Sequence, residues 1–289
     1  MSNRPPIEVP QGAIRLNTDS QKLEFYAQDR WYEMATDPAS PIAGRGIWGG
    51  GLQGPNASPY STNVIDMVQI QTKGNAIDFG DTTLLKGQSA GCGDKTRGLF
   101  IGGYWPSATN NIDFITIATT GDAVDFGDTI DANSRGGGTM SSRTRGIITR
   151  PSDDATMEFI TISSTGNSAE FGEDTIADNG AIMSNQTRGI NASGNSSVNS
   201  ISYITIAQLG NAVDFGDITA GAGIYGTSGL GNATRGIIIA GRVAPSPSDD
   251  GNVMHYITMS TLGNSADFGD TSAKIYASGT AANATRGLV

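Results

Sequence analysis

The chain has one cysteine and one histidine among its 289 residues. A lone Cys92 excludes an internal disulfide, and a lone His255 excludes a metal site built from several histidines. Basic residues are also few: 18 Lys and Arg stand against 28 Asp and Glu, so the formal net charge is −10. Nucleic acid is therefore not expected as a partner, because phosphate binding requires clustered Lys and Arg.

Long apolar runs and helical periodicity are also absent. No segment has the length and hydrophobicity of a signal peptide or a membrane span, so we expect a soluble, unprocessed chain without membrane insertion. No stretch shows sustained apolar spacing of three and four residues, which argues against long helices. The 40 glycines favour short strands joined by many turns. The expected fold class is all-β.

One pattern recurs five times after residue 41. A copy contains Arg-Gly with a short apolar run, a segment such as Ile112–Ile117, and an Asp-Phe-Gly-Asp motif such as Asp125–Asp128. Copies begin 43 to 52 residues apart, at Arg45, Arg97, Arg145, Arg188 and Arg235, with a partial sixth at Arg286. A unit of this size cannot bury its own apolar face, so the copies must stack on one another.

The spacing inside the repeat predicts its strands. The first apolar residue of the middle segment precedes the Phe of the last motif by 14 residues in every copy, as in Ile112 and Phe126. Constant spacing indicates two paired antiparallel strands, and Gly121-Asp122 between them predicts a two-residue turn. The run Leu99–Ile101 predicts a third strand, buried on both faces. The 17 to 20 residues before the next Arg leave room for a fourth.

Four short strands per unit predict the blade of a β-propeller. With blades counted from each hairpin to the following Arg strand, residues 42–289 give five, and Thr285–Val289 completes the fifth. The strand at Arg45 is then left over, to latch the ring or to pair elsewhere. The alternative is an elongated β-solenoid or an intertwined trimeric fibre, which Gly-rich repeats also suit.

Residues 1–41 differ from the repeats and predict a small β-meander with a linker. Alternating segments around 13–17, 22–26 and 31–34 place Ile14, Leu16, Leu23, Phe25 and Trp31 on one apolar face. Three such strands are barely stable alone, so the meander is expected to dock on another surface. The predicted anchor interface consists of Leu16, Leu23, Phe25, Trp31 and Tyr32.

The recurring acids and arginines are interpreted as structural. Acid pairs such as Asp125 and Asp128 could bind Ca²⁺ or act as acid and base, but two carboxylates are few for a cation that takes six to eight oxygens. The favoured interpretation is a ring of Arg–Asp contacts between units. Its members are Arg45, Arg97, Arg145, Arg188, Arg235, Arg286, Asp81, Asp128, Asp217 and Asp270. No catalytic residue, metal or cofactor is expected.

Two residues with reactive side chains occupy repeat positions. His255 stands where other copies have Asp66, Asp113, Glu158 and Ser202, so it is interpreted as a surface variant of a structural position. Cys92 stands where others have Met140 or Leu230, which predicts a small buried apolar residue.

Loops of variable length are the candidate recognition sites. They span residues 49–63, 103–111, 149–156, 191–200 and 241–253, and are expected on one side of the assembly. Tyr60, Tyr104 and Trp105 in them could stack on sugar rings of a host-surface glycan. Ordinary drift of loop sequences explains the same residues equally well.

The motifs resemble those of a known group of proteins. Gly12–Thr18, continuing through Lys22–Phe25 to Trp31, resembles a short module of tail-fibre and other virion proteins of tailed bacteriophages. The repeats, with Ile112–Ile117, Gly210–Asp217 and Thr96–Gly98, are similar to kelch-like repeats of structural proteins from marine phages, cyanophages especially. Ser202 and Glu170–Glu173 depart from the common pattern, which weakens any claim that each unit binds the same ligand.

The resemblance implies a non-enzymatic virion protein, made in the host cytoplasm and present in several copies, as in a homo-oligomer. Its N-terminal module would bind other virion proteins, and its propeller would contact a glycan or protein of the host surface. A place in the tail, as a fibre, nozzle or fibre-linked protein, is the first expectation. A capsid-surface decoration or head-fibre protein is the second, and a propeller enzyme acting on polysaccharide is the third.

Overall fold

The computed structural model describes residues 9–17, 22–33, 44–52, 61–104, 107–133, 138–149, 155–174, 176, 180–192, 199–219, 224–243, 249–275 and 278–289. The chain divides into two compact units, Met1–Pro41 and Ile42–Val289, which match the two predicted segments. All regular structure in the described ranges is β-strand, arranged in antiparallel sheets without helices. The prediction of an all-β protein is confirmed.

The first unit is a three-stranded sheet in the order β1-β2-β3, formed by Ile14–Asn17, Lys22–Ala27 and Arg30–Glu33. Ile14 lies opposite Phe25 and Leu16 opposite Leu23, so these four side chains share a face, as predicted. Tyr32 lies opposite Phe25 and joins them.

Trp31 does not share that face, contrary to the prediction. It pairs with Tyr26, and side chains alternate along a strand, so the indole lies on the opposite side of the sheet. There the Arg15 guanidinium lies 4.1 Å from the centroid of its ring.

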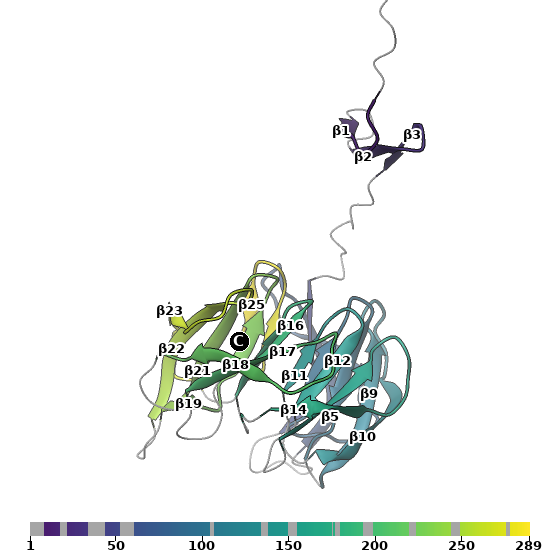
Figure 1. Cartoon of the computed structure of the whole chain (residues 1–289). Helices are drawn as coiled ribbons and strands as arrows, with labels where there is room; N and C mark the ends of the chain where they lie inside the picture. Colours follow the sequence, from purple (N-terminus) through teal and green to yellow (C-terminus); the bar gives the residue numbers. More distant parts are fainter. Residues whose placement is uncertain are drawn as a thin grey trace, which may run out of the picture. The chain divides into compact units, whose positions relative to one another are not determined.

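The described residues of the second unit form six antiparallel sheets. Figure 1 shows how their strands are arranged. A complete sheet has four strands in the order of β7-β8-β9-β10, with the Arg strand second, which confirms the predicted fourth strand. The first sheet comprises β4 (Arg45–Leu52), β5 (Ser61–Gln69) and β6 (Ile77–Asp81). The second comprises β7 (Ala90–Gly93), β8 (Arg97–Ile101), β9 (Thr109–Thr116) and β10 (Val124–Asn133).

The remaining sheets repeat this arrangement. The third comprises β11 (Thr139–Ser141), β12 (Arg145–Thr149), β13 (Thr156–Thr161) and β14 (Ala169–Glu173). The fourth comprises β15 (Ala181–Ser184), β16 (Arg188–Ala192), β17 (Ser200–Thr205) and β18 (Val213–Asp217). The fifth comprises β19 (Ile224–Tyr225), β20 (Ser228–Gly231), β21 (Arg235–Val243), β22 (Asp249–Thr258) and β23 (Ala266–Asp270). The sixth has only β24 (Ala281–Ala282) and β25 (Gly287–Leu288).

The predicted division between units is wrong by one strand. Each Arg strand pairs with the hairpin that follows it, as Arg97 does with Thr116. The strand at Arg45 is therefore not left over, because Arg45 pairs with Gln69 in the first sheet. The Arg strand also pairs with the short strand before it, since three residues between Gly93 and Arg97 suffice only for an antiparallel turn.

The hairpin turn also differs from the prediction. β9 ends at Thr116, and the Thr119 amide donates a hydrogen bond to the Thr116 carbonyl, so the chain turns before Gly121. The Gly121 amide then donates to the carbonyl of Phe79 at 2.7 Å, along the edge of the preceding sheet. The constant spacing of 14 residues thus reflects a segment held between two sheets instead of a two-residue turn.

The core lies between consecutive sheets. Leu99, Phe100 and Ile101 are all buried, which confirms that the Arg strand is covered on both faces. Phe79 of the first sheet packs in one cluster with Phe100 and Ile115 of the second. The Phe of this motif is therefore covered by the next unit along the chain in the first four units, at Phe79, Phe126, Phe171 and Phe215.

The glycine of this motif allows that close approach. Gly127 has a φ of 145°, a conformation that side chains rarely adopt, and a Cβ there would lie 2.6 Å from the Gly166 carbonyl. The same relation joins Gly80 to Gly121, Gly172 to Gly210 and Gly216 to Gly263.

Replacing Gly127 by Ala is expected to lower the free energy of unfolding more than replacing Gly269 by Ala. Both positions have positive φ, and the strain of an alanine there is about 1–3 kcal/mol. Only Gly127 adds a clash with a neighbouring backbone, since nothing lies within 4 Å of a Cβ at Gly269. Denaturant unfolding of both variants provides the measurement. Equal losses would show that the close approach contributes nothing.

Candidate functional site

The arginines of the repeat join neighbouring units through backbone carbonyls. The Arg97 guanidinium donates to the Ile162 carbonyl of the next hairpin at 2.9 Å. Arg145 donates to Ile206 and Arg188 to Met259 at the same distance, and Arg45 donates to Ile117. Each arginine therefore ties its own sheet to the hairpin that covers it.

Aromatic rings support these guanidinium groups. Arg97 lies 4.7 Å from the ring centroid of Phe114, and Arg145 lies 4.6 Å from that of Phe159. Arg188 and Arg235 lie over Tyr203 and Tyr256 in the same way. Such cation–π contacts hold the planar guanidinium in place. The ammonium group of a lysine is not planar and would stack on the ring less well.

The predicted Arg–Asp ring is wrong in its partners. The ion pairs Arg15–Glu24 and Lys86–Asp113 involve no repeat arginine, and the repeat arginines Arg45, Arg97, Arg145 and Arg188 donate to backbone carbonyls. Asp81, Asp128 and Asp217 contribute their backbone instead, since each amide donates to a side-chain oxygen in the next unit. Those oxygens belong to Asp122, Asn167 and Asn264, which explains the recurring Gly-Asn or Gly-Asp pair.

A side-chain cap explains the threonine before five of the six repeat arginines, all except Arg45. The Asp94 carboxylate accepts hydrogen bonds from the Thr96 amide, the Thr96 hydroxyl and the Arg97 amide. Asn185, Asn232 and Asn283 form the same capped turn. The sequence signal is an Asp, Ser or Asn three residues before every repeat arginine except Arg45, and it was not used in the prediction.

Apart from these contacts, the described residues contain a buried ion pair. Lys86 Nζ lies 2.9 Å from Asp113 Oδ2, and both side chains are fully buried. Lys86 also donates to the carbonyls of Phe100 and Asn111. Burial lowers the pKa of Lys86, against the opposing effect of the Asp113 charge. This pair was not predicted, because a lysine and an acid do not recur together at these two positions of the repeat.

The position of Asp113 holds a different buried polar group in each later unit. Glu158 accepts from the Ile130 amide, and the Ser202 hydroxyl donates to Asp174. His255 is 6% exposed, so its interpretation as a surface residue was wrong. Neither ring nitrogen of His255 has a hydrogen-bond partner among the described residues. Burial lowers its pKa below the ordinary 6.5, and the Asp267 charge opposes this only in part.

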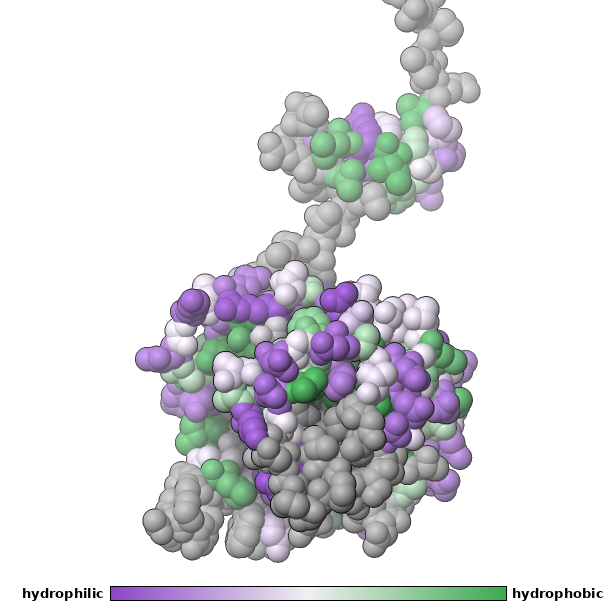
Figure 2. Space-filling model, turned by 90° about the vertical axis from the view of Figure 1, so that its left-hand side faces the viewer, coloured by the Kyte–Doolittle hydropathy of each residue, from purple (hydrophilic) through white to green (hydrophobic). Residues whose placement is uncertain are grey.

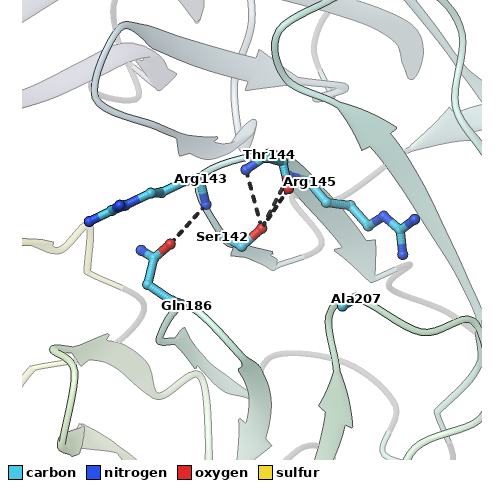
Figure 3. Close-up of a pocket in the computed structure, with 6 residues that line it drawn as sticks. All are labelled: Ser142, Arg143, Thr144, Arg145, Gln186 and Ala207. Atoms are coloured by element: carbon cyan, nitrogen blue, oxygen red, sulfur yellow. Dashed lines mark hydrogen bonds between the residues drawn. The ribbon is translucent and has the colours of Figure 1, made fainter. Parts of the chain in front are cut away.

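A hollow of about 280 Å³ lies between the turns of the third and fourth sheets (Figure 3). Ser142, Arg143, Thr144, Arg145, Gln186 and Ala207 line it. Figure 3 shows the side chains of Arg143 and Arg145 extending in opposite directions from their turn. The Arg143 amide donates to Gln186 Oε1 at 3.0 Å. This lining has no carboxylate, so it does not provide a general acid and base.

Of the three predicted recognition residues, the structure describes Tyr104. Tyr60 and Trp105 lie outside the described residues. Tyr104 is half-buried, and its backbone pairs with Gly87 in an isolated bridge. Cys92 is half-buried instead of fully buried as predicted, and it packs against the cluster around Leu99, where burial of the thiol raises its pKa to about 12.

No group of three metal-ligating side chains occurs in the described ranges. These ranges also contain no helix long and apolar enough to cross a membrane. No family model matches the chain, and no curated protein matches it.

Replacing Arg145 by Lys is expected to lower the free energy of unfolding by about 1–2 kcal/mol, because the variant loses a charged hydrogen bond and a planar stack. Arg235→Lys is the matched control, since Arg235 stacks on Tyr256 and its guanidinium has no hydrogen bond to a following hairpin among the described residues. The control is expected to cost about 0.5 kcal/mol, measured by denaturant unfolding. Similar losses in both variants would contradict the role assigned to the carbonyl contact.

The stability of the protein is expected to decrease as the pH falls below about 6.5, in part through His255. Its pKa is lower in the folded than in the unfolded chain, so the unfolded chain binds more protons in this range. The stabilisation is complete above the unfolded pKa and is lost as the pH falls through the folded pKa. His255→Gln keeps a similar volume without titrating, so thermal unfolding of this variant should depend less on pH. An identical pH dependence of thermal unfolding in both proteins would show that His255 does not contribute to it.

Proposed function

We propose that the chain is a non-enzymatic structural protein of a phage particle, associated with the tail. In this proposal residues 42–289 form a kelch-like β-propeller, and residues 1–41 attach it to other virion proteins. The protein acts in the virion after synthesis in the host cytoplasm, in several copies. The exposed loops contact a glycan or protein of the host surface.

Contacts between the end and the beginning of the repeats support a closed ring. The Arg286 guanidinium donates to the Gln71 carbonyl at 3.3 Å, as the other arginines donate to the hairpins of following units. A Cβ on Gly46 would lie 3.1 Å from the Cβ of Ala281. The same relation joins Gly189 to Met140 and Gly236 to Met183 in consecutive units. The sixth sheet thus meets the first as each sheet meets the next.

The five sheets with a hairpin would be the five blades of the propeller. The two-stranded sheet β24–β25 would lie between the fifth blade and the first. A solenoid or fibre, in contrast, would leave the first and last units far apart, without the Arg286–Gln71 contact.

A structural role is supported by how the recurring polar residues are used. The arginines bind carbonyls, the turn residues bind amides, and Asp113 binds a buried lysine. Every one of these groups stabilises the contact between strands or sheets. These recurring groups are therefore used in contacts within the protein itself.

The exposed apolar face of the first unit is the observation that carries the anchor role. Ile14 is 64% exposed and Leu16 is 60% exposed, and both lie beside Leu23 and Phe25. Figure 2 shows hydrophobic side chains side by side on this unit. A three-stranded sheet that exposes this much apolar surface gains stability when another protein covers it.

Labelling of intact phage particles with an antibody against residues 42–289 tests the proposal. Density at the tail supports it, and density on the head would replace the tail assignment with a capsid-surface decoration protein. Absence from purified particles would overturn the virion assignment. Release of oligosaccharides from host-surface glycans by the purified chain would overturn the non-enzymatic assignment.

The anchor role has a separate test. Leu16→Asp and Phe25→Asp place charges on the apolar face of the first unit and should abolish incorporation into particles. Val124→Asp is the matched control, since Val124 is 58% exposed on the second unit. Incorporation of all three variants at wild-type levels would refute the anchor.

A further inference from the structure

The hollow beside the turn at 142–145 lies at a place where the next two units have a bridging side chain. Its volume is about 280 Å³. In the next unit the Asn185 amide donates to the Ala233 carbonyl at 3.2 Å. In the unit after that, the Asn232 amide donates to the Ala284 carbonyl at 3.0 Å. Each of these bonds joins the capping residue of one turn to the turn of the following unit.

Small side chains explain why this gap is open. Ser142 stands where those two units have asparagine, and its side chain is shorter and carries no amide. Its hydroxyl oxygen accepts hydrogen bonds from the Thr144 and Arg145 amides of its own turn, at 3.3 and 3.2 Å. The fourth sheet contributes Ala207, another small residue, to the lining. The space that an asparagine bridges elsewhere is therefore accessible here.

The side chains around the hollow offer several hydrogen-bond donors. In Figure 3, Arg143 and Gln186 lie on one side, and Arg145 and Ala207 lie on the other. Because Gln186 Oε1 accepts from the Arg143 amide at 3.0 Å, the two N–H donors of the Gln186 side chain are left for another partner. The Arg143 guanidinium makes no hydrogen bond or ion pair in the part of the chain that the structure describes.

The charge of the lining is opposite to that of the whole chain. The chain has a net charge of −10, whereas the hollow is lined by two arginines and no carboxylate. Arg145 is held by the carbonyl and the ring described above. Arg143 belongs to none of the recurring contacts, because other units have Lys95, Gln186, Ala233 or Ala284 at its position. Its exposed guanidinium is therefore available to a ligand.

We propose that this hollow binds an oxyanion, with the Arg143 guanidinium and the Gln186 amide as its principal donors. A planar guanidinium can donate two parallel hydrogen bonds to a carboxylate or a phosphate group. The volume lies below the range of roughly 300–1,000 Å³ that is typical of drug-sized ligands. The ligand that carries the oxyanion is therefore small, such as one acidic sugar or one sugar phosphate. This inference goes beyond the proposed function, because it does not depend on a place in a virion.

Calorimetric titration of the full chain with glucuronate, glucose 6-phosphate and neutral glucose tests the proposal. The three probes share a sugar ring and differ in the oxyanion. At least one charged sugar is expected to bind about tenfold or more tightly than glucose, and to bind more weakly as the salt concentration rises. The tighter of the two distinguishes a carboxylate from a phosphate as the preferred group. Equal affinity for all three sugars, or no saturable binding of either charged sugar, would overturn the proposal.

Variants of the full chain locate the site. Ser142→Asn introduces the side chain that bridges this gap in the next two units and is expected to weaken binding about tenfold or more. Asn185 caps its own turn, so this variant should unfold at the temperature of the wild type or above it. Arg143→Gln removes the charge of an exposed side chain and should weaken binding to a similar extent. Lys73→Gln, the matched control, removes an exposed charge from the first hairpin and should leave binding unchanged.

Two results with these variants would contradict the assignment. Unchanged binding by both Ser142→Asn and Arg143→Gln would place the oxyanion elsewhere on the chain. Equal weakening by Lys73→Gln would indicate general attraction to positive charge instead of a site. Neither result bears on the proposed function, which is tested on phage particles, so failure of the one is distinguishable from failure of the other.

Discussion

The structure of residues 42–289 depends on the approach of one backbone to another at the Asp-Phe-Gly-Asp motif. A sheet of three or four short strands buries little apolar surface alone, so its stability comes from the sheet that follows. At Gly127 the following unit comes so close that a methyl group would collide with Gly166. The following unit also buries the Phe126 ring beside this glycine. One short motif therefore provides both the apolar contact and the space for it.

The arginine contact follows from this packing. A guanidinium between two sheets is half-buried, and a carboxylate beside it would also have to lose water. A backbone carbonyl such as that of Ile162 satisfies the donor without a second buried charge, and the ring of Phe114 covers the guanidinium plane. The Lys86–Asp113 pair shows the other solution, in which two charges are fully buried and further hydrogen bonds to carbonyls complete the site.

The strands and the buried positions could be predicted from the sequence, because apolar runs such as Leu99–Ile101 and constant spacings report packing directly. The turn at Gly121-Asp122 could not be predicted, because the rule for two-residue turns treats a hairpin in isolation, and here Gly121 bonds to Phe79 of another sheet. The partner of each arginine was missed for a similar reason, since a carbonyl has no sequence signature. Trp31 was placed on the wrong face because its strand register depends on the turn at Gln28 and Asp29, both with positive φ.

Variation among the units indicates where recognition can and cannot reside. Four units keep the same backbone contacts yet hold Asp113, Glu158, Ser202 and His255 at one buried position, each with different surroundings. A ligand bound once per unit would need the same donor groups each time, and these four side chains share no charge or hydrogen-bonding pattern. The repeat thus conserves the packing of the units, whereas the polar side chain at this position varies. Under the proposed function, specific recognition would arise from what does not recur, namely the first unit and the variable loops.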